Sequence, residues 1–249
     1  MRVFGVLQPC FRRPAAPRST PSASPTCMSL PNLAEALAHH EAGRPDEAEA
    51  IYRRILEHDP CSADALHLLG VLQAERGEQA SAESLIRAAL AIADEPDYRY
   101  NLGQFLAGRG RLDEAAEAFA AVVRLKADHA AALLALGVVL RRLRRPGESI
   151  DALRRALAIR PDLAEAHSNL GIVFQEVGRP ELAIAAFCDA IRCCPDHAEA
   201  HCNLGHVLQT QGRLGEAAAS IGMALHFRPD LPEGWCNLGN VLKDQGRLG

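Results

Sequence analysis

The residues best suited to metal chemistry lie close together near position 195. Two thiols and two imidazoles follow one another there, at Cys193, Cys194, His197 and His201. Thiolate and imidazole groups are the usual ligands of structural zinc. The two cysteines are adjacent, however, and adjacent side chains of a helix point about 100° apart. We therefore expect no metal and no cofactor, and we interpret these cysteines as small apolar residues near a helix end.

Other catalytic patterns are missing from the sequence. It shows no phosphate-binding glycine loop, no nucleophile elbow and no pair of carboxylates withdrawn from water. The stretch Gly108–Arg111 reads Gly-Arg-Gly-Arg, but it lies where a turn between helices is expected. Eight cysteines without a secretory signal or a regular framework indicate the reduced thiols of a cytoplasmic protein. The sequence thus predicts a chain that is not an enzyme by itself.

The composition excludes several broad classes of protein. Hydrophobic residues make up 48% of the 249 residues, which is enough for a buried core, so a wholly disordered chain is excluded. Aromatic residues are only 4%, so smaller aliphatic side chains must fill that core. A net charge of −4 argues against a general nucleic-acid binder, which needs a basic surface. No apolar run approaches about 18 residues, the length that spans a membrane. We expect neither nucleic acid nor a membrane as a partner.

An internal repeat organises most of the chain. The dipeptide Leu-Gly recurs at steps of 33 and then 34 residues, and a later small residue is followed four positions on by a larger apolar one. Self-similarity at a period of about 34 residues indicates stacked repeats rather than a globular domain with a single hydrophobic core. The glycines are Gly70, Gly103, Gly137, Gly171, Gly205 and Gly239, and the small residues are Ala48, Ala82, Ala115, Ser149, Ala183 and Ala217.

Each unit has the pattern of two helices, as residues 164–197 illustrate. Apolar residues at helical spacing fill the first half, which ends near Gly178, a residue type that commonly follows a helix C-terminus. Pro180 suits the first turn of the next helix, where no intrahelical N–H bond is needed, and Pro195 ends that helix. The small Gly171 should let the two helices approach closely.

The predicted fold class is all-α, an α-solenoid of about six and a half helix-turn-helix units. The solenoid should span residues 29–249, with units starting near residues 29, 63, 96, 130, 164, 198 and 232. The last unit begins in phase but is truncated before its second helix, so part of its packed face should stay exposed. We expect from this either a longer natural protein or self-association through the open C-terminal end.

The segment 1–28 differs from the rest of the chain. Residues 1–27 contain four arginines and no acidic residue, and five prolines forbid a long helix there. We expect a disordered basic segment rich in proline and serine. A mis-assigned start upstream of Met28 and an organellar targeting peptide both remain open as alternatives.

The last units carry a family resemblance. Trp235–Gly239 reads Trp-Cys-Asn-Leu-Gly, and Ala183, Phe187 and Pro195 stand at fixed places in the preceding units. This pattern resembles the tetratricopeptide repeat, and the resemblance covers residues 29–249. Histidine replaces the tryptophan in the two units before the last. The resemblance implies a right-handed superhelix whose first helices line a concave groove for a protein or peptide partner.

A mostly polar stripe runs along the first helices. Places two, six, nine and thirteen of each unit fall on one face, because separations of about 4, 7 and 11 residues are near whole turns. By the resemblance, this face would hold an extended polypeptide. From it we take as candidate groove residues Asn101, Asn169, Asn203, Asn237, Asn240, His206, Glu176 and Asp244.

Asn169, Asn203 and Asn237 recur every 34 residues. Stacked helices would bring them into a ladder, and each carboxamide offers a donor and an acceptor to a peptide backbone. The repeats from Ala164 to Leu248 are similar to those of protein O-GlcNAc transferases, in which an asparagine ladder holds the acceptor polypeptide and a glycosyltransferase domain follows. Asparagine is also common at this place of tetratricopeptide repeats as a structural contact, so both interpretations stay open.

The sequence therefore predicts a non-catalytic scaffold that binds protein or peptide in its groove. One alternative is the substrate-recognition arm of a larger O-GlcNAc-transferase-like glycosyltransferase whose catalytic domain is missing from this chain. Another is a structural scaffold that binds through its convex or end surfaces. A run of arginines between Arg141 and Arg160 fits an acidic peptide segment or, as is more common, a solvated turn.

Overall fold

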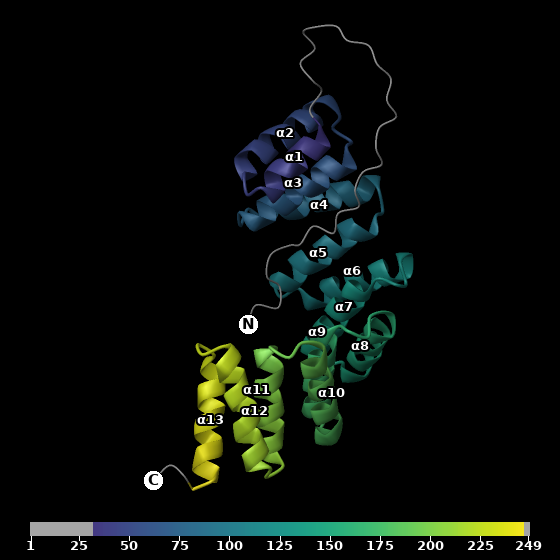
Figure 1. The fold of residues 1–249 in the computed structure, drawn as a ribbon. Helices are drawn as coiled ribbons and strands as arrows, with labels where there is room; N and C mark the ends of the chain where they lie inside the picture. The colour runs from purple at the N-terminus through teal and green to yellow at the C-terminus, as the bar shows by residue number, and fades with distance from the viewer. Residues whose placement is uncertain (1–31, 247–249) are drawn as a thin grey trace. The chain divides into compact units, whose positions relative to one another are not determined.

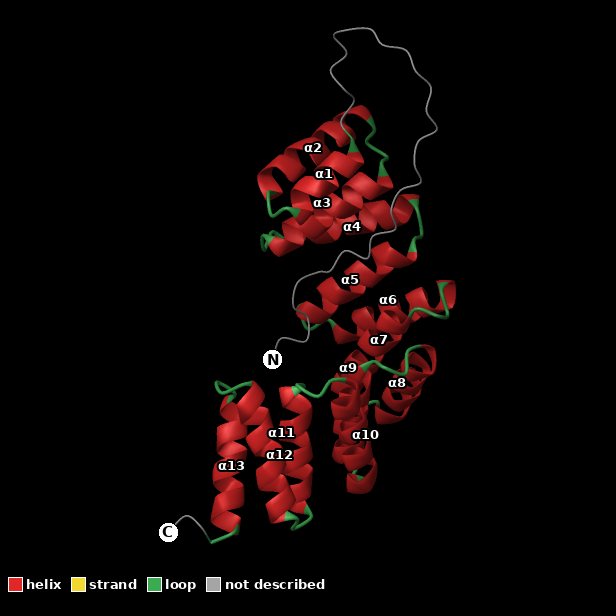
Figure 2. Ribbon diagram, in the orientation of Figure 1, coloured by secondary structure: helices red, strands yellow, loops and turns green. Residues whose placement is uncertain are grey.

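The computed structural model describes residues 32–246, and every regular element in that range is a helix (Figures 1 and 2). The segment 1–28, with its predicted disorder, lies outside the described residues. None of the helices in the described range is both long and apolar enough to cross a membrane. The thirteen helices of this range are α1 Leu33–Glu41, α2 Pro45–His58, α3 Ala63–Glu75, α4 Gln79–Ile92, α5 Pro96–Gly108, α6 Leu112–Leu125, α7 Ala130–Arg142, α8 Pro146–Ile159, α9 Ala164–Glu176, α10 Pro180–Cys193, α11 Ala198–Thr210, α12 Leu214–Phe227 and α13 Pro232–Asp244.

Local residue types fix where the helices begin and end. A first-position proline suits the opening turn because its φ is already helical and its missing N–H has no partner there. Gly178 has a φ of +70°, a conformation that glycine adopts without a steric penalty. The predicted stop at Gly178 and the predicted start at Pro180 are both confirmed. The helices that begin with proline are those starting at Pro45, Pro96, Pro146, Pro180 and Pro232.

The described helices fall into two compact units, the first of which ends at Lys126. Within it, α1 pairs with α2, α3 with α4, and α5 with α6, and each hairpin packs on the next. Tyr52, Leu72, Ile86 and Phe119 are fully buried between these layers. The first helices α3 and α5 also touch directly, so residues on their facing sides can bond across the repeat boundary.

The second unit begins at Ala127 and contains α7–α13. Its hairpins are α7 with α8, α9 with α10, and α11 with α12, and the unpaired α13 packs on α11 and α12. Leu153, Phe187 and Ile221 stand at equivalent places of the second helices and are fully buried. Val241 of α13 joins the same core as Ile221. The predicted fold class, an all-α helical-repeat solenoid, is confirmed.

Small residues bring the helices of one hairpin together. A Cβ built on Gly171 would lie 2.7 Å from Cε1 of Phe187, closer than real Cβ atoms approach another carbon. The Phe187 ring therefore occupies the space that a side chain at position 171 would need. The close approach predicted at this glycine is confirmed, and it fixes which face of α9 remains for other contacts.

Candidate partner-binding surface

Asn101 is the candidate groove residue of the first unit, where it lies on α5. Its side chain is 1% exposed, and its Nδ2 donates to Nε2 of His67 on α3 across 2.9 Å. Burial lowers the pKa of His67 to about 4, against a smaller opposing effect of Asp64, so the ring is neutral near pH 7 and accepts this bond. Asn101 therefore joins two successive first helices inside the fold.

Asn169 lies on α9 of the second unit and is also buried. It is 8% exposed, and its Nδ2 donates to the carbonyl oxygen of Glu165 one turn earlier, at 2.9 Å. The bond stays within one helix, so Asn169 does not join neighbouring repeats as Asn101 does. Both side chains nevertheless satisfy contacts of the fold rather than face outward.

Asn203 and Asn237 lie at the equivalent place of α11 and α13, two helices that touch each other. Both are half-buried. Asn237 Nδ2 donates to Sγ of Cys202 on α11 across 3.3 Å, which leaves its amide oxygen for another partner. The Asn203 side chain has no hydrogen-bond partner among residues 32–246. The ladder of asparagines thus consists of residues in different situations rather than one uniform row.

His206 and Asn240 continue this face about one turn further along α11 and α13. His206 is half-buried and Asn240 is exposed. Neither side chain has a hydrogen-bond partner in the part of the chain that the structure describes. Together with Asn203 they form a patch of polar groups that the fold leaves unused. We refer to Asn203, His206 and Asn240 as the open polar face.

Glu176 and Asp244, at the far end of the same stripe, are tied to the preceding first helix. Arg141 of α7 donates to Glu176 Oε1 at 2.8 Å, and Gln209 of α11 donates to Asp244 Oδ2 at 2.7 Å. Each carboxylate keeps a second oxygen for other contacts. Both candidates therefore combine a contact within the fold with remaining acceptor capacity.

These bonds follow one rule that the sequence analysis missed. The bonded partners stand 34 or 35 residues apart and occupy neighbouring places of successive first helices. In the first unit His40 and Glu75 obey the same spacing at 3.0 Å. A search for donor and acceptor residues about one repeat plus one residue apart would have found them. Grouping residues by the face of a single helix does not reveal these bonded pairs, because each bond joins two helices.

Family comparisons agree with this geometry. Four models, each describing a tetratricopeptide repeat, match residues 39–105, 91–128, 128–196 and 189–219. The chain belongs to the tetratricopeptide repeat family. It is 30% identical over 110 residues to tetratricopeptide repeat protein 8 of Caenorhabditis elegans. That stretch is 43% of this chain and only 22% of the relative, so most of the relative's length has no counterpart in the match.

Solved structures of other proteins share the fold. The structure of pilF from Pseudomonas aeruginosa has a TM-score of 0.72 at 18% identity, covering 84% of this chain and 95% of that one. The structure of YrrB, described as a tetratricopeptide repeat protein with an unusual peptide-binding site, has a TM-score of 0.61 at 20% identity and covers 74% and 96% of the two chains. At these identities the likeness shows the fold alone.

The repeat position that Trp235 occupies has a structural role, and histidine performs the same role in the two preceding units. The ring nitrogen Nε1 of Trp235 donates to the carbonyl oxygen of Pro229 at 2.8 Å. Nε2 of His201 makes the same contact with Pro195 at 2.9 Å, and His167 repeats it in the unit before. A carbonyl oxygen only accepts, so each histidine must carry its proton on Nε2. The replacement of tryptophan by histidine thus preserves the bond that holds the repeat start.

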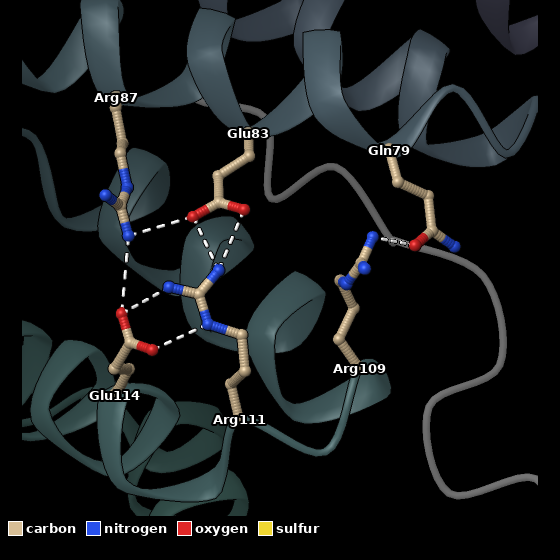
Figure 3. A network of polar contacts seen from close by, with 6 residues as sticks. All are labelled: Gln79, Glu83, Arg87, Arg109, Arg111 and Glu114. Carbon is tan, nitrogen blue, oxygen red and sulfur yellow. Dashed lines mark hydrogen bonds and ion pairs between the residues drawn. The ribbon is translucent and has the colours of Figure 1, made fainter.

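A charged network in the first unit joins two second helices, α4 and α6 (Figure 3). Arg111, the residue that caps α6, bonds Glu83 of α4 at 2.7 Å and Glu114 of α6 at 2.6 Å. The Arg111 guanidinium lowers the pKa of Glu114. The two carboxylates are therefore matched by Arg87 and Arg111, whereas Arg109 bonds the neutral Gln79. The drawn residues are Gln79, Glu83, Arg87, Arg109, Arg111 and Glu114.

The arginine run of the second unit is also largely paired. Arg145 bonds Glu148 at 2.7 Å, and Arg141 bonds Glu176. Arg154 lies over the ring of Phe174, 6.0 Å from its centroid. These contacts favour the solvated-turn interpretation over a patch for acidic peptides.

The cluster of cysteine and histidine near position 195 does not converge. Cys194 Sγ donates to Asp196 at 3.0 Å, while His197 accepts from the Ala200 N–H and caps α11. His201 turns to the Pro195 carbonyl, as described above. Within residues 32–246 no group of three or more potential ligands is arranged to hold a metal ion.

Proposed function

We propose that this chain is a non-catalytic scaffold that binds an extended protein or peptide segment along the first helices of its second unit. The observation that carries the proposal is the open polar face. Asn203, His206 and Asn240 present hydrogen-bonding groups on the touching helices α11 and α13, without a partner in the described range. The fold does not need these groups, whereas it uses the side chains of Asn101 and Asn169.

The chemistry of this face suits a polypeptide backbone. A carboxamide both donates and accepts, which matches the alternating N–H and C=O groups of an extended chain. Packed helices lie about 8–10 Å apart, so an extended chain would meet one repeat about every three residues. We place Asn237, Glu176 and Asp244 at the margin of the site, because each keeps an acceptor oxygen. The described peptide-binding site of YrrB, which shares the fold, supports a ligand of this class.

Selection of peptides, followed by mapping of the bound region, tests the proposal. Twelve-residue peptides are selected from a random library on the full chain, and hydrogen exchange is compared with and without the best binder. The proposal expects new protection in α11 and α13 and little change in α10 and α12. Protection confined to the second helices would contradict it and favour a scaffold that binds through its convex surface.

A narrower proposal is the substrate-recognition arm of an O-GlcNAc-transferase-like glycosyltransferase. The recurrence of Asn203 and Asn237 on touching helices supports it, because such an arm holds backbone rather than particular side chains. Selected peptides of unrelated sequence should then bind with similar affinity, and N-methylation of alternate backbone amides should abolish binding. Binding that depends on one side-chain motif and tolerates N-methylation would contradict this narrower form.

The proposal also covers location and partner class. The six cysteines in residues 32–246 are all free thiols, which supports a cytoplasmic location. The net charge of −4 and the pairing of the arginine run support a protein rather than a nucleic-acid partner. The matched models describe a structural repeat rather than a catalytic domain, which supports the non-catalytic role.

A further inference from the structure

Three hairpins pair an arginine with a glutamate where the second helix begins. The arginine directly precedes the helix, and the glutamate stands three residues later. Nε and Nη2 of the guanidinium donate to the two carboxylate oxygens at 2.5–2.7 Å, which is the strong, bidentate form of such a pair. The pairs are Arg111 with Glu114, Arg145 with Glu148, and Arg213 with Glu216.

Arg179 precedes α10 at the same place of its hairpin, but the glutamate is replaced there. Leu182 stands three residues later and is 42% exposed. The Arg179 side chain is exposed and makes no hydrogen bond or ion pair within residues 32–246. Glu181 is only two residues from Arg179, a spacing at which helical side chains do not face each other. The start of α10 thus combines an unpaired guanidinium with an exposed apolar side chain.

Two further residues extend this surface. Val177, directly after α9, is 38% exposed, so apolar side chains stand on both sides of Arg179 in the sequence. Arg144 belongs to the turn between α7 and α8, and it too is exposed without a hydrogen bond or ion pair in the described range. The bond from Arg141 to Glu176 joins the ends of α7 and α9 three residues before these two arginines, which holds the two turns side by side.

We refer to Arg144, Val177, Arg179 and Leu182 as the turn patch. We propose that the turn patch docks a segment of a partner protein in which a glutamate or aspartate stands beside an apolar residue. The partner carboxylate accepts two bonds from Arg179, as Glu148 does from Arg145 in the neighbouring hairpin. The apolar side chain packs on the exposed Val177 and Leu182. Two unpaired cations make the patch positive, so charge complementarity selects an acidic segment.

The surrounding parts of this chain do not supply such a segment. The hairpins on both sides of α9 and α10 pack against them, and with both in place Leu182 remains exposed. Residues 1–31 contain four arginines and no acidic residue, so they offer no carboxylate to Arg179. The turn patch lies on α7–α10 and their turns, whereas the open polar face lies on α11 and α13. The two sites are therefore separate, and this inference does not depend on the proposed peptide groove.

A peptide selection with a counter-selection tests the proposal. Twelve-residue peptides with one fixed glutamate and random residues elsewhere are selected on the full 249-residue protein. Peptides that also bind the Leu182→Glu variant, whose fold is verified by circular dichroism, are discarded. This variant gives Arg179 the partner that the other hairpins have, so the step removes ligands of any other surface. We expect the retained peptides to carry an apolar residue near the glutamate and to protect residues 177–185 from hydrogen exchange. Replacing their glutamate by glutamine should weaken binding about tenfold or more.

Two further protein variants locate the site by fluorescence anisotropy of the best retained peptide. Arg179→Gln removes an unpaired charge and should weaken binding about tenfold or more. Arg213→Gln removes the equivalent arginine of the next hairpin, which is already paired with Glu216, and serves as the matched control with unchanged affinity expected. The absence of any retained peptide, or equal weakening by the two variants, would overturn the proposal. A wild-type dimer in sedimentation that Leu182→Glu dissociates would overturn it in favour of a second copy.

Discussion

Arg144 has a left-handed backbone conformation in the turn between α7 and α8. In the equivalent turns of other hairpins a glycine has this conformation. The φ of Arg144 is 60°, whereas the other positive-φ residues of the described range are all glycines, with φ between 68° and 81°. A side chain in this region costs roughly 1–2 kcal/mol because its Cβ crowds the following carbonyl. The Arg144 side chain makes no hydrogen bond or ion pair within residues 32–246 that would offset that cost.

Arg144→Gly should therefore stabilise the protein. Relief of the left-handed strain is partly cancelled by the greater freedom of glycine in the unfolded chain, about 0.5–1 kcal/mol. We expect a net gain of about 0.5–1 kcal/mol in the free energy of unfolding. Urea titration monitored by circular dichroism measures it. Arg144→Ala keeps the strain and should change stability little, so an equal gain in both variants would refute the explanation.

His67 makes the stability of the first unit depend on pH. Burial lowers its folded-state pKa to about 4 from 6.5, so the unfolded chain binds its proton more readily. The stability that the neutral ring contributes is full above pH 6.5 and is lost as pH falls toward 4. We expect a loss of about 3 kcal/mol over that interval, since each pKa unit corresponds to about 1.4 kcal/mol.

Thermal unfolding followed between pH 7 and pH 4 tests this dependence. His67→Gln keeps an acceptor for Asn101 without a titrating ring, and its melting temperature should fall less steeply across the interval. His206→Gln replaces a half-buried histidine outside this contact and should retain the wild-type slope. An equally steep loss of stability with falling pH in His67→Gln and in the wild type would rule out His67 as the cause.

At the scale of the helix, the sequence predicted each hairpin, but it did not predict the contacts between hairpins. Glycine, proline and apolar spacing placed the turn at Gly178 and the start at Pro180, because these residues act locally. The bond from Asn101 to His67, by contrast, depends on which residue the neighbouring helix offers one repeat away. Asn203 has the same type and register but meets no such acceptor. The position of a residue in the repeat therefore identified the polar face of the first helices. It did not identify which side chains of that face lack a hydrogen-bond partner.

Gly171 and Gly239 stand at equivalent places of α9 and α13, and they allow a direct comparison of packing. In Gly171→Ala the new methyl group collides with the Phe187 ring, and we expect a loss of about 1–3 kcal/mol. In Gly239→Ala the methyl group meets no described atom, and the better helix propensity of alanine should add up to about 1 kcal/mol. Chemical denaturation of both variants measures the difference. Equal effects would show that the space between Gly171 and Phe187 is not tightly packed.

At the scale of the chain, the described helices form two compact units whose polar faces differ. In the first unit the Asn101 side chain bonds His67 of the neighbouring repeat. In the second unit the open polar face lies on α11 and α13. The repeat period predicted the fold class for the whole described range, because one pattern recurs in every hairpin. It did not predict the division at Lys126, for which the sequence pattern offers no break.

The central claim is that the chain uses one set of polar residues on its first helices for folding and another for binding. Comparing the triple variant Asn203→Ala, His206→Ala and Asn240→Ala with Asn101→Ala tests it most directly, by calorimetric titration of a library-selected peptide together with thermal unfolding. The triple variant should bind about tenfold or more weakly, since each lost bond is worth about 0.5–1.5 kcal/mol, while its unfolding stays within about 1 kcal/mol of wild type. Asn101→Ala should bind normally but lose about 1–3 kcal/mol of stability. Full binding by the triple variant, with its fold verified, would contradict the account.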